Sequence, residues 1–196
     1  YLSAEGVKLY TDYETNYRPK GDRRKMSRFK GSADYWGIAY GQGHLYASPL
    51  NMARVVSIVS NDGRFFPTRY DLDDDVRNEW VVKSGTDLLK SAMQAEADKH
   101  RRSGIRLPGK EDPERMFSKT GTPERTWIYV DDNGSVVECK PNDGWYICSI
   151  NSKAVGSPLA IAVRMERLGA LGSSAAVKLT AETILPVLQE CGYQIY

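Results

Sequence analysis

The chain has 196 residues, which is enough for one well-buried core, so a single domain is the default expectation. With 41% hydrophobic and 27% charged residues, its composition is that of an ordinary globular protein and excludes a disordered or membrane-spanning chain. The net charge of +2 is too small to indicate a polyanionic partner. Because the chain opens at Tyr1 without an initiator Met, we expect it to be a piece of a longer protein.

Residues 1–40 hold many tyrosines, glycines and charges without a sustained period, so we expect a loop-rich flap. Within them, residues 18–30 (RPKGDRRKMSRFK) are strongly basic. Such a stretch could bind nucleic acid or phosphate, but only Phe29 could supply an aromatic platform, so a solvated loop is favoured. The acidic run at 71–75 lacks the spacing of a calcium loop and predicts no metal site.

The first predicted helix lies between residues 48 and 63. Ser48 is typical of an N-cap, Pro49 fits the first helical position, and Gly63 stands where the helix should stop. Its apolar stripe is Met52, Val55, Val56 and Val59.

The second predicted helix runs roughly from 84 to 100 behind a cap at Ser84 or Thr86. Its apolar residues recur at helical spacing, which predicts one buried face. They are Leu88, Leu89, Ala92, Met93 and Ala97.

Five short runs rich in β-branched and aromatic residues follow: RMFSKTGT, TWIYV, SVVEC, WYICSI and LAIAVRME. Turn signals at 132–134 (Asp-Asn-Gly) and 142–144 (Asn-Asp-Gly) separate some of them, so they predict an antiparallel meander. The run LAIAV is apolar on both faces, which predicts a central strand with helices on each side.

A last helix is predicted from Ser174, and Pro186 should kink or restart it. The fold class is therefore α+β, an antiparallel β-meander flanked by helices. Residues 1–196 form a single partial domain: the flap, a helical part at 41–100, and the sheet with the C-terminal helix at 115–196. The buried stripe of that helix is Val177, Ala181, Ile184, Leu185 and Leu188.

The cysteines and histidines do not form a zinc pattern, since no C-x-x-C is present and only His44 and His100 could add nitrogen ligands. We expect buried thiols at Cys139, Cys148 and Cys191 rather than a disulfide. His44 stands in a predicted loop and is expected to be structural. His100 stands near a helix end, where it would complement the helix dipole.

Residues 116–124 (MFSKTGTPE) carry the densest chemistry in the chain. Alternation along a strand puts Lys119 and Thr120 on opposite faces, so packing alone would bury one of them. A binding site is a better explanation, because an ammonium, a hydroxyl and the bare backbone of Gly121 offer an anion anchor, a donor and close access. Thr122 adds a second hydroxyl and an N–H that could face a developing oxyanion.

In its context, this stretch resembles the back half of a penicillin-binding protein transpeptidase domain, a β-lactamase/transpeptidase-like fold. Lys-Thr-Gly-Thr is followed by DGWYICSI, SPLAIAVRMER and a closing helix. Upstream, GQGHLYASPLNMARVVSIVSNDGRFFP at 41–67 is similar to the family's G-Q-G, Thr/Ser-Pro-Leu, and helix ending in Asn-x-Gly and a proline. The order and spacing of these pieces agree over roughly 41–190.

The family uses three motifs, Ser-x-x-Lys, Ser-x-Asn and Lys-Thr-Gly, of which the third is present here. The resemblance implies that Lys119, Thr120, Gly121 and Thr122 form the catalytic segment. Lys119 would supply positive charge, Thr120 and Thr122 would hold the carboxylate of a substrate or β-lactam, and the Thr122 N–H would form half of the oxyanion hole. It implies no metal and no organic cofactor.

The nucleophile is expected to lie outside this chain. SRFK at 27–30 spells Ser-x-x-Lys, but Gly31 and the surrounding cations are unlike a buried helix start that could desolvate the lysine. SND at 60–62 falls at a helix end and is similarly misplaced. Two further departures are Ser118, where the family has Gly, and a hairpin around 133–134 that is expected to rim the cleft.

The resemblance implies that the longer parent crosslinks peptidoglycan stem peptides through a serine acyl-enzyme and binds β-lactam antibiotics, while this soluble piece alone is inactive. The parent would be membrane-anchored, with this domain on the outer face of the cytoplasmic membrane. The missing N-terminal part of the domain would pair with the strand at 159–166, so an exposed edge and dimerisation through it are expected. The alternatives are a non-catalytic penicillin-binding or sensor-like module and, less favoured, nucleic-acid binding through 18–30.

Overall fold

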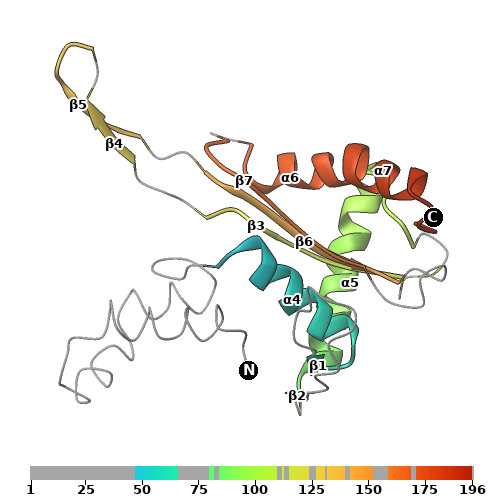
Figure 1. Ribbon diagram of the computed structural model, residues 1–196. Coiled ribbons are helices and arrows are strands. Elements are labelled where there is room, and N and C mark those ends of the chain that lie inside the picture. The colour runs from blue at the N-terminus through green and yellow to red at the C-terminus, as the bar shows by residue number, and fades with distance from the viewer. Residues whose placement is uncertain are drawn as a thin grey trace, which may run out of the picture.

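The centre of the protein is an antiparallel sheet of three strands with helices on both faces (Figure 1). A computed structural model describes residues 47–65, 80–81, 84–109, 112, 115–123, 127–130, 132–139, 142–151, 159–168 and 171–195. The strand order is β3–β6–β7, with β3 at Met116–Gly121, β6 at Gly144–Ile150 and β7 at Leu159–Met165. This architecture confirms the predicted α+β class. The predicted flap and its basic stretch at 18–30 lie outside the described residues.

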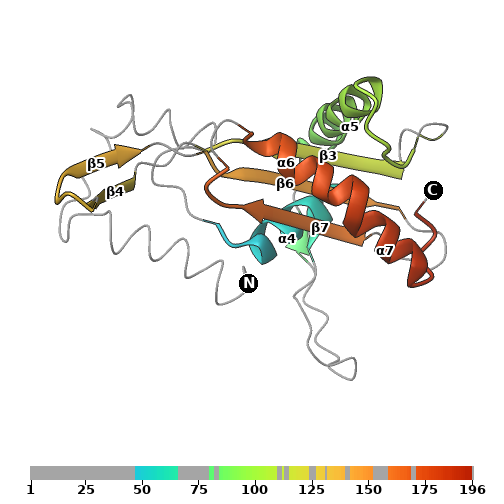
Figure 2. The same ribbon diagram turned by 90° about the horizontal axis from the view of Figure 1, so that it is seen from above.

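The two middle runs of the predicted meander form a hairpin of their own. Among the described strands, β4 (Trp127–Val130) and β5 (Val136–Cys139) pair with each other alone and extend beyond the end of the main sheet (Figures 1 and 2). The turn between them uses Gly134, whose φ of 78° suits glycine. Because β3 already pairs along its whole length with β6, the hairpin finds no place between them. A second small sheet joins β1 (Arg64–Phe65) to β2 (Trp80–Val81).

Helix α4 (Pro49–Ser60) has the predicted ends. The Ser48 Oγ accepts a hydrogen bond from the Asn51 N–H at 3.2 Å, and Gly63 follows the helix with a φ of 84°. Val56 and Val59 are buried against the sheet, but Val55 is 45% exposed, so its place in the stripe was wrong. The helix lies across β6 and β7, and only a narrow face of it touches them.

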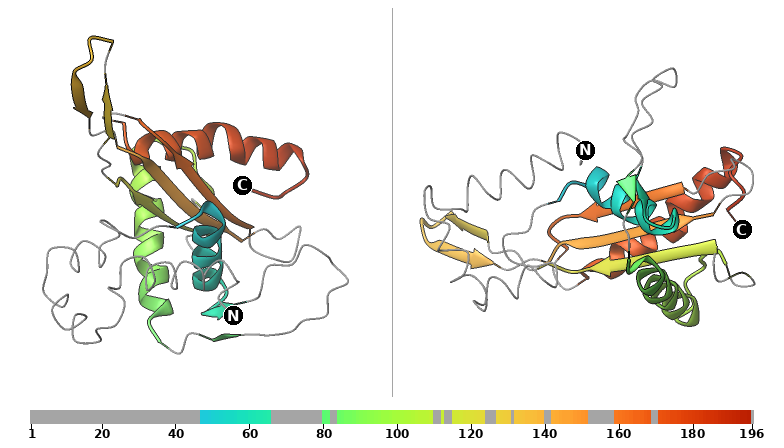
Figure 3. Two further views of the ribbon diagram at one scale, coloured as in Figure 1. Left: turned by 60° about the vertical axis from the view of Figure 1, so that its left-hand side comes forward. Right: turned by 90° about the horizontal axis from the view of Figure 1, so that it is seen from below.

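Helix α5 (Thr86–Arg102) packs along β3, as Figures 2 and 3 show. The predicted side-chain cap is wrong, since Gly85 occupies the N-cap with a φ of 89° and no side chain caps the helix. Met93 and Ala97 are buried as predicted. The earlier apolar residues are exposed, because the first turns of α5 extend past the three-stranded sheet (Figure 1). The exposed ones are Leu88 at 75%, Leu89 at 51%, and Ala92.

The C-terminal helix is continuous but irregular. It comprises α6 (Ser173–Leu179), a π-helical turn (Thr180–Ile184) and α7 (Leu185–Glu190). Pro186 cannot donate a hydrogen bond and would clash with the carbonyl four residues earlier, which explains the wider turn just before it. The predicted irregularity and the buried stripe are confirmed; Val177, Ala181 and Leu185 are buried, and Ile184 and Leu188 pack at its margin. Within the described residues, every helix is too short or too polar to cross a bilayer.

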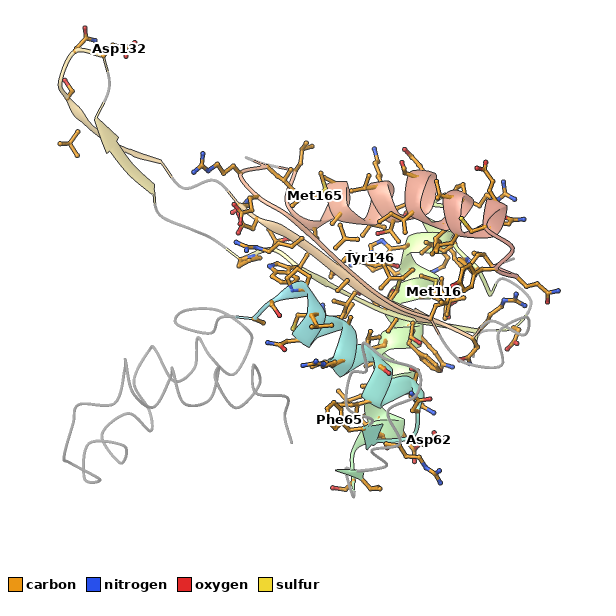
Figure 4. The ribbon with its side chains drawn as sticks, in the orientation of Figure 1. Asp62, Phe65, Met116, Asp132, Tyr146 and Met165 are labelled. Carbon is orange, nitrogen blue, oxygen red and sulfur yellow. The ribbon has the colours of Figure 1, made fainter. Side chains whose placement is uncertain are left out.

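The sheet separates two apolar clusters. Met116 and Tyr146 belong to the cluster under the C-terminal helix (Figure 4), whereas Phe117 and Ile147 belong to the cluster under α4. Helix α5 contributes to both from the β3 side, through Ala97 and Met93 respectively. Among the described strands β6 is central, and β7, which contains LAIAV, has one strand partner and helices on both of its faces. The central position predicted for LAIAV therefore stays a prediction, and the edge of β7 without a described partner matches the edge expected at 159–166.

Replacing Val56 by Ala should lower the free energy of unfolding by about 2 kcal/mol, because two buried methyl groups leave a cavity between α4 and the sheet. The matched control is Val55→Ala on the adjacent, exposed position, which should change it by less than about 0.5 kcal/mol. Urea unfolding followed by far-ultraviolet circular dichroism measures both. Equal losses would contradict the assigned packing face.

Candidate functional site

The segment predicted as catalytic occupies the end of β3. Lys119 stands opposite Ile147, Thr120 opposite Tyr146, and Gly121 opposite Trp145. Because side chains alternate along a strand, Lys119 lies on the α4 side of the sheet and Thr120 on the side of the C-terminal helix. Lys119 is exposed and Thr120 is half-buried, so neither enters the core.

The Lys119 ammonium donates a hydrogen bond to the backbone carbonyl of Thr120 at 2.7 Å. This contact holds an exposed positive charge beside the end of the strand, where it can attract an anion. Gly121 places no side chain over the backbone there, and a methyl group at that position would only reach ordinary contact with Trp145. The resemblance also implies that residues 41–50 border this site; of these, 41–46 lie outside the described residues, and 47–50 include the start of α4.

The Thr120 hydroxyl is engaged by a residue that the sequence analysis missed. It donates to the Glu96 Oε1 of α5 at 2.6 Å. Burial by itself would raise the pKa of Glu96, but the hydrogen bond from Thr120 and the positive charges of Lys119 and Lys99 together lower it. Glu96 therefore faces β3 as a carboxylate. Glu96 lies three residues after Met93, beside the buried stripe of α5. That position is the sequence feature from which its contact with the sheet could have been predicted.

His100 lies one turn further along α5, with its Nε2 3.4 Å from the same Glu96 oxygen. Its ring meets the ring of Tyr146 edge to face, with 6.1 Å between the centroids. Burial lowers the pKa of His100, and the nearby Glu96 carboxylate opposes that effect only in part. The neutral ring is thereby favoured, so the predicted complement to the helix dipole comes from Lys99 and the arginines of the last turn instead.

Two buried hydroxyls lie behind this part of the site. Ser118 and Tyr146 are both fully buried, and neither hydroxyl has a well-aligned hydrogen-bond partner among the described residues. Burial raises the pKa of Tyr146, with the neighbouring Cys148 adding to the rise and the Ser118 hydroxyl opposing it. Ser118, the departure from the family glycine, thus faces the interior rather than the ligand side of the strand.

Thr122 is fixed by the start of α6. Its Oγ1 accepts a hydrogen bond from the Ser173 N–H at 3.1 Å and lies 3.0 Å from the Ser173 Oγ. The Ser173 N–H is one of the first donors of α6, which have no partner within the helix, and Thr122 satisfies it from another element. A side chain at Gly172 would collide with Thr122, since its Cβ would lie 2.6 Å from the Thr122 Cγ2.

A buried carboxylate ties the neighbouring strands together. Asp143, 1% exposed, accepts hydrogen bonds from the Arg164 guanidinium at 3.0 Å and from the Arg167 N–H at 3.2 Å. Arg164 also contacts Glu166 at 2.7 Å. Residues 142–144, predicted as a simple turn, therefore anchor the start of β6 to the end of β7. Gly144 then lies against the Gly172 carbonyl, which positions the beginning of α6.

The cysteines only partly match their prediction. Cys148 is a buried thiol, and burial raises its pKa to about 12, so it is inert as a nucleophile. Cys191 is also a free thiol but is exposed, which contradicts the expected burial. The side chain of Cys139 lies outside the described residues.

Comparison of the chain with protein-family models and with curated protein sequences found no match. The arrangement itself offers an exposed cation, an unhindered stretch of backbone and two hydroxyls at one end of a sheet. Each hydroxyl is held by a different helix, Thr120 by α5 and Thr122 by α6. These groups can bind an anion and polarise a carbonyl, and none of them is an activated nucleophile.

Replacing Asp143 by Ala should lower the free energy of unfolding by about 3 kcal/mol, because the buried carboxylate is lost while Arg164 stays beside it. Glu166→Gln removes the other, half-exposed partner of the same arginine and should cost less than about 1 kcal/mol. Chemical denaturation of the two variants measures the difference. Similar losses of unfolding free energy in the two variants would show that burial does not distinguish the two ion pairs.

Replacing Thr122 by Val should lower the free energy of unfolding by about 1 kcal/mol, since the first N–H of α6 loses its acceptor. Thr122→Ser keeps the hydroxyl and is expected to stay close to the parent protein. Thermal unfolding and amide hydrogen exchange at Ser173 report the effect. Unchanged protection of that amide in Thr122→Val would contradict the cap.

Proposed function

We propose that this chain is the C-terminal portion of a penicillin-binding D,D-transpeptidase, with residues 119–122 forming one wall of its acyl-transfer site. The observation that carries the proposal is the position of Lys-Thr-Gly-Thr at the end of β3, an outer strand among those described, with the exposed Lys119 ammonium beside it. The helix that begins at Ser-Pro-Leu, α4, packs on one face of the same sheet, and α6 packs on the other. This arrangement supports the resemblance seen in the order of the motifs.

In the proposed reaction, a serine from outside this chain attacks a carbonyl carbon of a stem peptide. The serine oxygen bonds to the carbonyl carbon, the peptide C–N bond breaks, and the leaving amine takes the proton that the serine hydroxyl gives up, so that an acyl-enzyme results. The amine of a second stem peptide then attacks the ester, which forms the crosslink and returns the serine. The Thr122 N–H would donate to the oxyanion of each tetrahedral intermediate. A β-lactam would acylate the same serine by opening its ring.

Among the residues proposed to hold the substrate carboxylate, Lys119 is the one best placed before a ligand arrives. Its ammonium is exposed, and its contact is a neutral backbone carbonyl. The Thr120 hydroxyl already donates to Glu96, and the Thr122 hydroxyl already serves Ser173. Carboxylate binding by either threonine therefore requires its hydroxyl to be shared or released.

The proposed parent acts outside the cytoplasmic membrane and carries the missing N-terminal strands of this domain. The outer edge of β7 has no strand partner among the described residues, which suits pairing with those strands or with a second copy of the chain. A non-catalytic penicillin-binding or sensor-like module is the second candidate, favoured only by the absence from this sequence of a Ser-x-x-Lys at a buried helix start.

Labelling with a fluorescent penicillin tests the proposal. The longer parent should be labelled at a serine upstream of residue 1, and this piece alone should not. Lys119→Ala in the parent should slow acylation roughly 10- to 100-fold through loss of a charge-assisted contact. Lys178→Ala, which removes an exposed lysine of α6, is the matched control and should acylate at nearly the parent rate.

Each outcome has a defined meaning. A parent that takes up no label would overturn the proposed function. Label on this piece, mapped to Ser27, would show that SRFK is the nucleophile motif after all. Label without turnover of stem peptides would favour the non-catalytic candidate.

A further inference from the structure

Two donors from different elements converge on one oxygen of Glu96. The Thr120 hydroxyl of β3 donates to Oε1 at 2.6 Å, and the His100 Nε2 of α5 lies 3.4 Å from the same atom. The side chains of Glu96 and His100 are only 16% and 15% exposed, so water does not readily replace either contact. Protonation of His100 should therefore affect the strength of the hydrogen bond from Thr120 to Glu96.

The His100 Nε2 is buried and makes no well-aligned hydrogen bond within the described residues, although the Glu96 carboxylate lies within reach. A neutral imidazole with its proton on Nδ1 offers only a lone pair at Nε2, and a lone pair cannot bond a carboxylate. The protonated ring offers an N–H there instead, aimed at an anion within reach. The neutral ring can carry its proton on either nitrogen, so protonation is what makes an N–H at Nε2 permanent and its contact with the carboxylate charge-assisted.

Several charged and titratable groups among the described residues surround Glu96 and His100. Lys119 faces it from β3 and Lys99 from α5, and both oppose a charge on His100. Arg101 and the Tyr146 hydroxyl lie on the inner side, where Arg101 is held by Asp98 and by the Pro108 carbonyl. Within the part of the chain that the structure describes, Glu96 is the anion that acts on His100, and it favours the protonated ring.

We propose that Glu96 is a positioning residue for the Lys-Thr-Gly-Thr segment and that His100 is its proton-dependent competitor. While His100 is neutral, Glu96 Oε1 belongs to Thr120 and holds the end of β3 against α5. When His100 takes up a proton, its Nε2–H donates to Oε1 and the bond from Thr120 weakens.

A consequence for ligands rests on the proposed function. A Thr120 hydroxyl released from Glu96 can donate to the carboxylate of a ligand held by Lys119. By linkage, such a ligand would favour the protonated state of His100 as strongly as protonation favours the ligand. The competition of Thr120 and His100 for Glu96 Oε1, called the latch from here on, does not depend on that consequence. It is a property of the chain without a ligand.

The experiment is a pH titration of the histidine ring signals by nuclear magnetic resonance. The chain has two histidines, and His44→Gln assigns the signal of His100. Thr120→Val should raise the pKa of His100 by roughly half a pH unit, because Oε1 loses its competing donor. Thr120→Ser keeps the hydroxyl and should leave the pKa at the parent value. Glu96→Gln should lower it, because the attracting charge is gone.

The decisive comparison is Thr120→Val in the Glu96→Gln background. The competition requires the carboxylate, so the rise should vanish there, whereas a mere change of packing would persist. A pKa of His100 that is unchanged or lowered in Thr120→Val, or raised equally in both backgrounds, would overturn the latch. Thr120→Ala replaces Thr120→Val if the latter does not fold, as judged by dispersed amide signals.

A second readout uses the longer parent and separates the latch from the proposed function. The pH profile of penicillin acylation should contain a step at the pKa of His100, with faster acylation on the acid side, and Thr120→Val should abolish that step. Acylation without such a step would overturn the ligand consequence alone. A parent that is never acylated would overturn the proposed function and leave the ring titration as the test of the latch.

Discussion

The pairing register of β3 with β6 is the constraint on which the rest of this structure depends. With Lys119 opposite Ile147, Phe117 faces the cluster under α4 and Met116 faces the cluster under the C-terminal helix. A slip of one residue would exchange these faces, turning Lys119 toward the C-terminal helix and separating Phe117 from the cluster under α4. The apolar partners on both sides therefore fix the register. The polar end of β3 takes its position as a consequence.

That register also decides which helix meets each hydroxyl. Thr120 turns toward α5 and finds Glu96, while Thr122, just beyond the strand, reaches the start of α6 at Ser173. The close approach of Gly144 to the Gly172 carbonyl brings α6 to that point. A segment of four residues is thus held by two helices far apart in sequence, and only the lysine is left facing outward.

Much of this could be predicted from local pattern. The ends of α4 followed from Ser48, Pro49 and Gly63, since caps and glycine stops are local chemistry. The wrong assignments concern contacts: Val55 and Leu88 match a helical stripe, but only the part of a helix that meets the sheet buries its stripe. The pairing of Glu96 with Thr120 joins residues 24 apart, and no spacing within either element could reveal it.

The two carboxylates near the site, Asp143 and Glu96, differ in whether the groups that donate to them can change with pH. Asp143 is 1% exposed and receives a guanidinium and a backbone N–H that cannot lose their protons near neutral pH, so its environment is fixed. Glu96 is reached by a hydroxyl and an imidazole, and an imidazole changes its donor capacity with pH. A carboxylate with interchangeable donors is stabilised less firmly by any one of them. The same sheet end therefore contains one rigid anchor, at the base of β6 and α6, and one adjustable contact, at the lysine-bearing strand.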